Sequence, residues 1–162
     1  MTPFVISRVF DAPRERVWKA WTDAGELKQW WGPQGFKVHS CNVDLRPGGT
    51  FLYGMTAPDG TDVWGKFTYR EIAAPKKLAF IVSFSDPKGG VTRHPWSPNW
   101  PLQTMSTVEF EEQGPRKTKV TVTWLPHEAT DAEREAFDAG RDGMKQGWGG
   151  TLDQFAGHLK KV

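Results

Sequence analysis

The sequence predicts an α+β domain in which an antiparallel sheet packs against a long C-terminal helix. Two short segments with helical spacing of apolar residues follow the first predicted strand. Alternating apolar and polar residues then recur in successive segments joined by short turns, which is typical of an antiparallel meander rather than a parallel sheet. Near the carboxyl end the apolar spacing becomes helical again.

The N-terminal elements are a strand and two short helices. The segment Phe4–Phe10 is rich in phenylalanine, valine and isoleucine, which favours a strand. A proline suited to a first helical turn opens Pro13–Trp21, and apolar residues continue at helical spacing. A second helix begins at Asp23, which has a glutamate three positions later as in a capping box, and ends at Gly32–Pro33.

The meander supplies the remaining strands, so that the sheet has about six or seven in total. A turn rich in glycine and proline separates most of them. The connection over residues 86–101 is longer and contains two tryptophans. The predicted strands after the helices are 36–45, 50–55, 62–72, 78–84, 103–112 and 117–125.

One long helix is expected at the carboxyl end. Thr130 and Glu133 have the spacing of a second capping box. Apolar residues from Phe137 onward then recur on one helical face, which must cover the sheet. The pair Gly149–Gly150 weakens this helix, and we expect a kink there.

Composition excludes several classes of function. The 162 residues fit one domain, 1–162, and the 21 basic against 19 acidic residues form no basic stripe for nucleic acid. No apolar run is long enough to span a membrane, and no leader pattern opens the chain, so a cytoplasmic protein is expected. The single Cys41 and the spacing of the histidines predict no disulfide, metal site or cofactor.

Several motifs together resemble one family. They are Trp30-Trp31-Gly32-Pro33, the segment Asp44–Gly49 and Gly147-Trp148. With these, the chain resembles the single-domain bacterial relatives of the activator of heat-shock protein 90 ATPase. These belong to the START-like group, which includes polyketide cyclases and lipid-transfer proteins. The resemblance implies a helix-grip fold, in which a curved sheet wraps around the last helix and leaves a cavity that often binds an apolar small molecule.

The leading hypothesis is a non-enzymatic protein that encloses a hydrophobic or aromatic small molecule between sheet and helix. Bulky aromatic side chains on both elements suit the walls of such a cavity. For Trp30, Trp31 and Trp148, packing in the core is the alternative. The predicted ligand-binding residues are Trp64, Phe84, Trp96, Trp100, Met105, Trp124, Met144, Trp148 and Phe155.

The 86–101 segment has two interpretations. It is a lid over the cavity, in which case Arg93 and His94 could meet a polar group of the ligand, or its tryptophans pack outside the sheet or in a homodimer contact. Two other functions stay open. One is a cyclase or hydrolase that uses the same cavity, although no catalytic residues can be assigned. The other is a protein-interaction module with a chaperone or another partner.

Overall fold

The computed structural model describes residues 1–161, which form eight strands and four helices. The strands are β1 (Phe4–Phe10), β2 (Lys37–Val43), β3 (Thr50–Thr56), β4 (Asp62–Ala73), β5 (Lys77–Ser85), β6 (Val91–Thr92), β7 (Thr104–Gly114) and β8 (Lys117–Pro126). The helices are α1 (Arg14–Thr22), α2 (Ala24–Trp30), α3 (Asp131–Ala139) and α4 (Arg141–Leu159). No helix within residues 1–161 is both long and apolar enough to cross a membrane.

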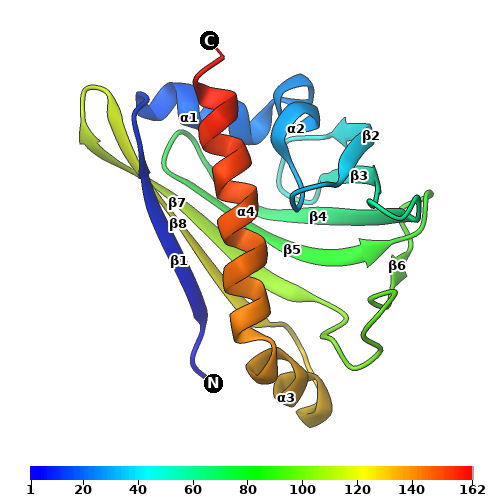
Figure 1. Ribbon diagram of the computed structural model, residues 1–162. Coiled ribbons are helices and arrows are strands. Elements are labelled where there is room, and N and C mark those ends of the chain that lie inside the picture. The colour runs from blue at the N-terminus through cyan, green and yellow to red at the C-terminus, as the bar shows by residue number, and fades with distance from the viewer. Residues whose placement is uncertain (162) are drawn as a thin grey trace.

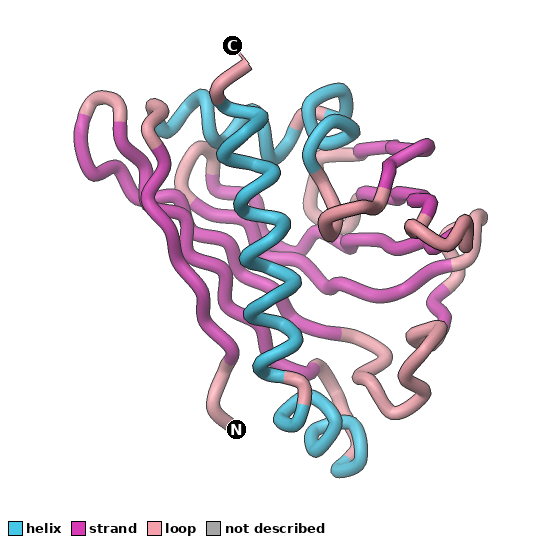
Figure 2. Tube along the Cα trace, in the orientation of Figure 1, coloured by secondary structure: helices cyan, strands magenta, loops and turns pink. Residues whose placement is uncertain are grey.

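The strands form one antiparallel sheet in the order β1-β8-β7-β5-β4-β3-β2, and the short β6 pairs with β5. The sheet curves strongly, and α4 runs along its concave side, with α1 and α2 at one end of α4 and α3 at the other (Figure 1). A long loop of the 86–101 segment lies at the same end as α3 (Figure 2). The α+β fold with a sheet around a C-terminal helix is therefore confirmed.

The helices and strands up to residue 126 follow the sequence prediction closely. The two short helices are present, and the Asp23 carboxylate accepts a hydrogen bond of 3.1 Å from the Glu26 backbone N–H, which caps α2. All seven predicted strands occur, with ends that differ by a few residues. The two-residue β6 is an addition that lies inside the 86–101 segment.

The predicted single C-terminal helix is wrong, because the structure contains two helices that meet at Gly140. The Thr130–Glu133 capping box is formed and starts α3. The Trp100 ring packs against the Cα of Gly140, where an added Cβ would lie 2.8 Å from the ring. The helical segment is interrupted at Gly140 and not at Gly149–Gly150, through which α4 continues as one helix.

An aromatic cluster joins the helices to the sheet. The ring centroids of Trp21 and Trp30 are 4.9 Å apart, and those of Trp30 and Phe155 are 4.5 Å apart. The Trp30 indole N–H donates a hydrogen bond of 2.9 Å to the Ala20 carbonyl oxygen. Trp30 therefore belongs to the core, as the packing alternative proposed.

Candidate ligand-binding cavity

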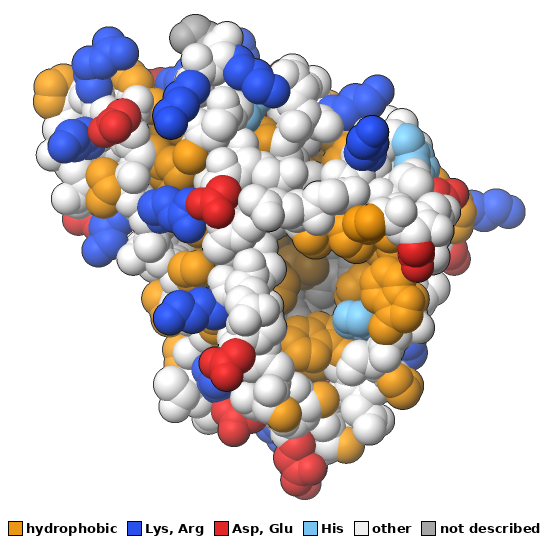
Figure 3. All heavy atoms as spheres, in the orientation of Figure 1, with side chains coloured by type: hydrophobic (Ala, Val, Ile, Leu, Met, Phe, Trp, Pro, Cys, Tyr) orange, Lys and Arg blue, Asp and Glu red, His pale blue; other side chains and the backbone are white. Residues whose placement is uncertain are grey.

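A cavity of about 280 Å³ lies between the concave face of the sheet, α4, the chain that follows α2, and the 86–101 segment. Figure 3 shows a hollow beside α4 that is bordered by hydrophobic side chains. Most of the lining residues are apolar or aromatic, and no Asp, Glu, Lys or Arg of residues 1–161 lines it. Burial of apolar surface is the main interaction that this cavity offers.

The cavity brings together seven of the nine residues predicted from the sequence. They come from the strands, from α4 and from the 86–101 segment, so the cavity joins parts of the chain that are far apart in sequence. The seven are Trp64, Phe84, Trp96, Trp100, Trp124, Met144 and Trp148.

Trp64 borders the cavity, but its indole packs on the other face of the sheet. It pairs with Gly54 across β3 and β4. A Cβ on Gly54 would lie 2.8 Å from the Trp64 ring and 2.7 Å from that of His39. The rings of Trp64 and His39 meet edge to face at 5.4 Å.

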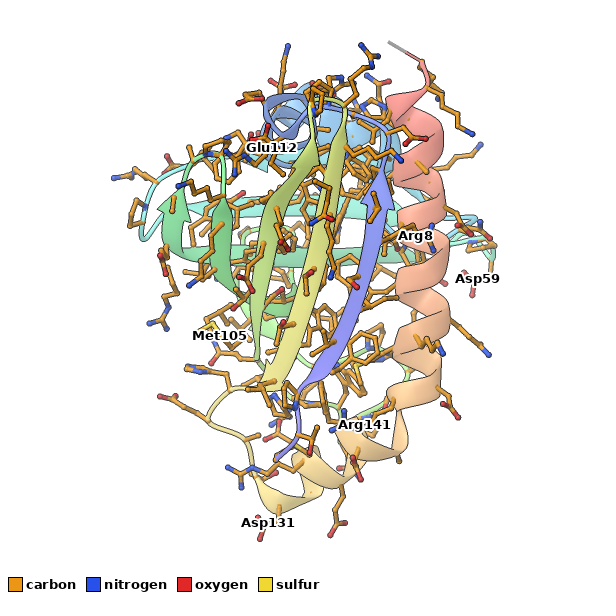
Figure 4. The ribbon with its side chains drawn as sticks, turned by 90° about the vertical axis from the view of Figure 1, so that its left-hand side faces the viewer. Arg8, Asp59, Met105, Glu112, Asp131 and Arg141 are labelled. Carbon is orange, nitrogen blue, oxygen red and sulfur yellow. The ribbon has the colours of Figure 1, made fainter. Side chains whose placement is uncertain are left out.

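Met105 and Phe155 do not line the cavity. Met105 alternates along β7 with the buried Thr104 and Ser106, so its side chain projects from the opposite face of the sheet, away from α4 (Figure 4). Phe155 is completely buried and packs against Phe10, with ring centroids 4.9 Å apart. Both assignments are corrected: strand alternation turns Met105 away, and the core fills the space around Phe155.

Two other cavity residues were not in the predicted set, because their partners are distant in sequence. Trp31, considered mainly as a packing residue, lies 5.8 Å from Trp148 between ring centroids and also lines the cavity. Tyr53 lies 5.7 Å from Trp31 and is directly opposite Gly65 in the sheet. A Cβ on Gly65 would be 2.5 Å from the Tyr53 hydroxyl oxygen, so the glycine makes room for the phenol ring. Alternation along β3 and the glycine opposite were the available signals.

The polar atoms near Tyr53 are largely buried. Burial raises the pKa of Tyr53 to about 12. The Trp31 indole N–H lies close to Tyr53 and partly offsets this rise in the Tyr53 pKa. Its distance and angle to any acceptor within residues 1–161 do not meet those of a normal hydrogen bond. Trp31 thus presents a buried donor without an acceptor at the cavity wall.

The 86–101 segment borders the cavity through His94, Trp96 and Trp100. Trp100 packs inward on Phe137 of α3, with ring centroids 5.7 Å apart. Trp96 is 56% exposed at the edge of the cavity. The segment therefore has the placement that the lid interpretation requires.

An ion pair holds this segment to α3. The Arg93 Nη1 atom donates to the Glu133 carboxylate at 2.6 Å, and the same carboxylate oxygen accepts the Leu102 backbone N–H at 2.7 Å. The other oxygen accepts the Thr130 backbone N–H at 3.0 Å. Chiefly because of this Thr130 hydrogen bond, the pKa of Glu133 is lowered to about 2.

The curved antiparallel sheet around α4, with an apolar cavity between them, defines a helix-grip domain of the START-like class. The chain belongs to the Activator of Hsp90 ATPase homolog 1-like protein family, whose model matches residues 11–160. No curated protein sequence matches the chain.

Solved structures of bacterial proteins agree with this assignment. A protein of Arthrobacter aurescens, studied by NMR, is 30% identical; the match has a TM-score of 0.77 and covers 99% of this chain and 87% of the other. A crystal structure from Mycobacterium smegmatis is 25% identical, with a TM-score of 0.73 and coverage of 96% and 88%. The AHSA1 protein of Silicibacter pomeroyi shares the fold at 17% identity, with a TM-score of 0.74 and 98% of each chain covered.

Proposed function

We propose that this protein binds an apolar or aromatic small molecule in the cavity between its sheet and α4. The observation that carries the proposal is the lining: aromatic and aliphatic side chains from distant parts of the chain surround about 280 Å³ without a charged residue among those described. A cavity of this size is near the lower end of those that hold small ligands. A compact ring system therefore suits it better than a long acyl chain.

The proposal is one of binding rather than of catalysis. The titratable side chains that line the cavity are His94 and Tyr53. Burial lowers the pKa of His94 and raises that of Tyr53 to about 12, so both are neutral at pH 7. Histidine is the commonest general acid–base residue, but among the described residues no carboxylate lines the cavity to act together with His94.

Native mass spectrometry of the purified protein, compared with its denatured mass, tests the proposal. The expected result is an added small-molecule mass that denaturation removes. The proposal fails if the protein carries no added mass both as purified and after incubation with a broad metabolite extract.

A pair of variants on α4 tests whether the ligand binds in this cavity. Gly147 lines the cavity, whereas Gly143, one turn earlier, does not, and a Cβ at either position has no neighbour within 4 Å. Gly147→Leu is expected to narrow the cavity and lower the bound fraction, while Gly143→Leu keeps it. Equal binding by the two variants would place the ligand elsewhere.

A further inference from the structure

The His94 ring is fixed in one tautomer by the turn that follows it. Its Nδ1 atom accepts the backbone N–H of Trp96 at 3.0 Å and that of Ser97 at 3.1 Å. Because both partners are donors, Nδ1 must offer a lone pair, and the proton of the neutral ring is on Nε2. Burial lowers the pKa of His94, which keeps the ring neutral.

The Nε2–H group is free to meet a ligand. His94 lines the cavity and packs beside Phe84, with ring centroids 4.7 Å apart. The Nε2 atom has no hydrogen-bond partner within residues 1–161 and is not among the fully buried unpaired atoms, so it is accessible to an acceptor outside the chain. The Trp31 indole N–H also lacks an acceptor, but this group is fully buried and is not accessible from the cavity.

The charge of the surroundings limits what the His94 Nε2–H group can bind. No cationic side chain among the described residues lines the cavity, and the nearby Arg93 is already paired with Glu133. An anion placed here would lose its hydration without a counter-ion, which is costly. A neutral acceptor loses much less and gains a hydrogen bond.

We propose that the cavity selects an uncharged aromatic or alicyclic molecule that carries a carbonyl-type oxygen, and that the Nε2–H of His94 donates to this oxygen. This inference rests on the proposed function, since it names the class of ligand for the same cavity. It makes His94 a specificity-determining residue: the aromatic walls bind the ring system, and the histidine distinguishes the polar substituent.

Three naphthalenes that differ in one substituent test the inference: 2-acetylnaphthalene, 2-isopropenylnaphthalene and 2-naphthoate. Dissociation constants are measured at pH 7 by ligand-detected NMR with the full chain. The ketone is expected to bind about fivefold more tightly than the isopropenyl compound, which has the same shape but no oxygen, as one neutral hydrogen bond predicts. The naphthoate is expected to bind more weakly than the ketone.

Variants of His94 separate its two roles. In His94→Asn the amide oxygen can replace Nδ1 in the turn, but nothing replaces Nε2, so the preference for the ketone should disappear. In His94→Gln the amide nitrogen extends toward the position of Nε2, so this variant should regain part of the preference for the ketone. His39→Asn is the matched control, because His39 lies on the other face of the sheet. This variant should prefer the ketone to the same extent as the wild type.

The outcomes distinguish the two proposals. Equal binding of ketone and isopropenyl compound by the wild type, or tightest binding of the naphthoate, overturns the inference but leaves cavity binding intact. A ketone preference that persists in a folded His94→Asn variant overturns the role of His94. If none of the three probes binds but native mass spectrometry detects a bound small molecule, the inference fails and the proposed function stands. If neither experiment detects binding, both fail. The wild-type comparison keeps the test decisive even if a variant does not fold.

Discussion

The carboxylate of Glu133 is buried, with 8% of its side chain exposed, whereas its partner Arg93 is 51% exposed at a distance of 2.6 Å. The two residues join the 86–101 segment to the first turn of α3. The pair is therefore asymmetric: backbone N–H donors surround the Glu133 carboxylate, whereas about half of the Arg93 side chain is exposed to solvent.

This asymmetry predicts unequal effects on stability. Glu133→Ala leaves the backbone N–H groups of Thr130 and Leu102 without their acceptor, and is expected to lower the free energy of unfolding by about 2–3 kcal/mol. Arg93→Ala removes an exposed partner and should cost about 1 kcal/mol or less. Denaturant unfolding of both variants measures the difference, and equal losses would contradict the assignment.

The lowered pKa of Glu133 predicts a dependence of stability on pH. Its pKa is about 2 in the folded chain against an ordinary value of 4.5, so its contribution is complete above pH 4.5. That contribution is lost as the pH falls from 4.5 toward 2. The difference in unfolding free energy between wild type and Glu133→Gln should shrink over this interval, and a difference that stays constant would refute the prediction.

Two glycines at the start of α4 should respond in opposite directions to alanine. A Cβ on Gly140 would lie 2.8 Å from the rigid Trp100 ring, so Gly140→Ala is expected to destabilise the protein by about 1–3 kcal/mol. Gly143 has open space around its Cα, and Gly143→Ala should stabilise it by about 0.5–1 kcal/mol. Thermal unfolding of the two variants gives the signs, and shifts in the same direction would argue against this packing.

Gly65→Ala should change the cavity as well as the stability. The added methyl group would meet the Tyr53 ring, which must move toward the cavity or displace β4. A loss of about 1–3 kcal/mol is expected, together with weaker binding of 2-acetylnaphthalene. Denaturant unfolding and the same NMR titration measure both effects. Gly143→Ala, which lies outside the cavity, is the control for binding, and undiminished binding by Gly65→Ala would show that Tyr53 does not shape the site.

The sequence predicted the elements well where their signals are local. The Thr130–Glu133 capping box could be identified because both partners lie within one helical turn. The other partners of Glu133, Arg93 and Leu102, come from a remote segment and follow no spacing rule. A residue's role within its own element was thus predictable, while its tertiary partners were not.

The candidate site shows the same limit. Trp148 was predicted as a wall residue from the apolar face of a helix, and the cavity includes it. Met105 was misplaced because strand register decides which of two neighbouring residues faces inward, and a shift by one residue reverses the choice. Gly140 was overlooked as the helix break because its partner, the Trp100 ring, belongs to a loop.

At Gly140, the 86–101 segment also contacts the junction between α3 and α4. The Trp100 ring contacts the cavity, the backbone at Gly140 and the Phe137 side chain at once. A ligand that displaces the Trp100 ring would weaken its contacts with Gly140 and Phe137, at the junction between α3 and α4. If a ligand displaces Trp100, we expect the angle between α3 and α4 to change, and the outer surface of α3 to differ between the ligand-bound and the free protein.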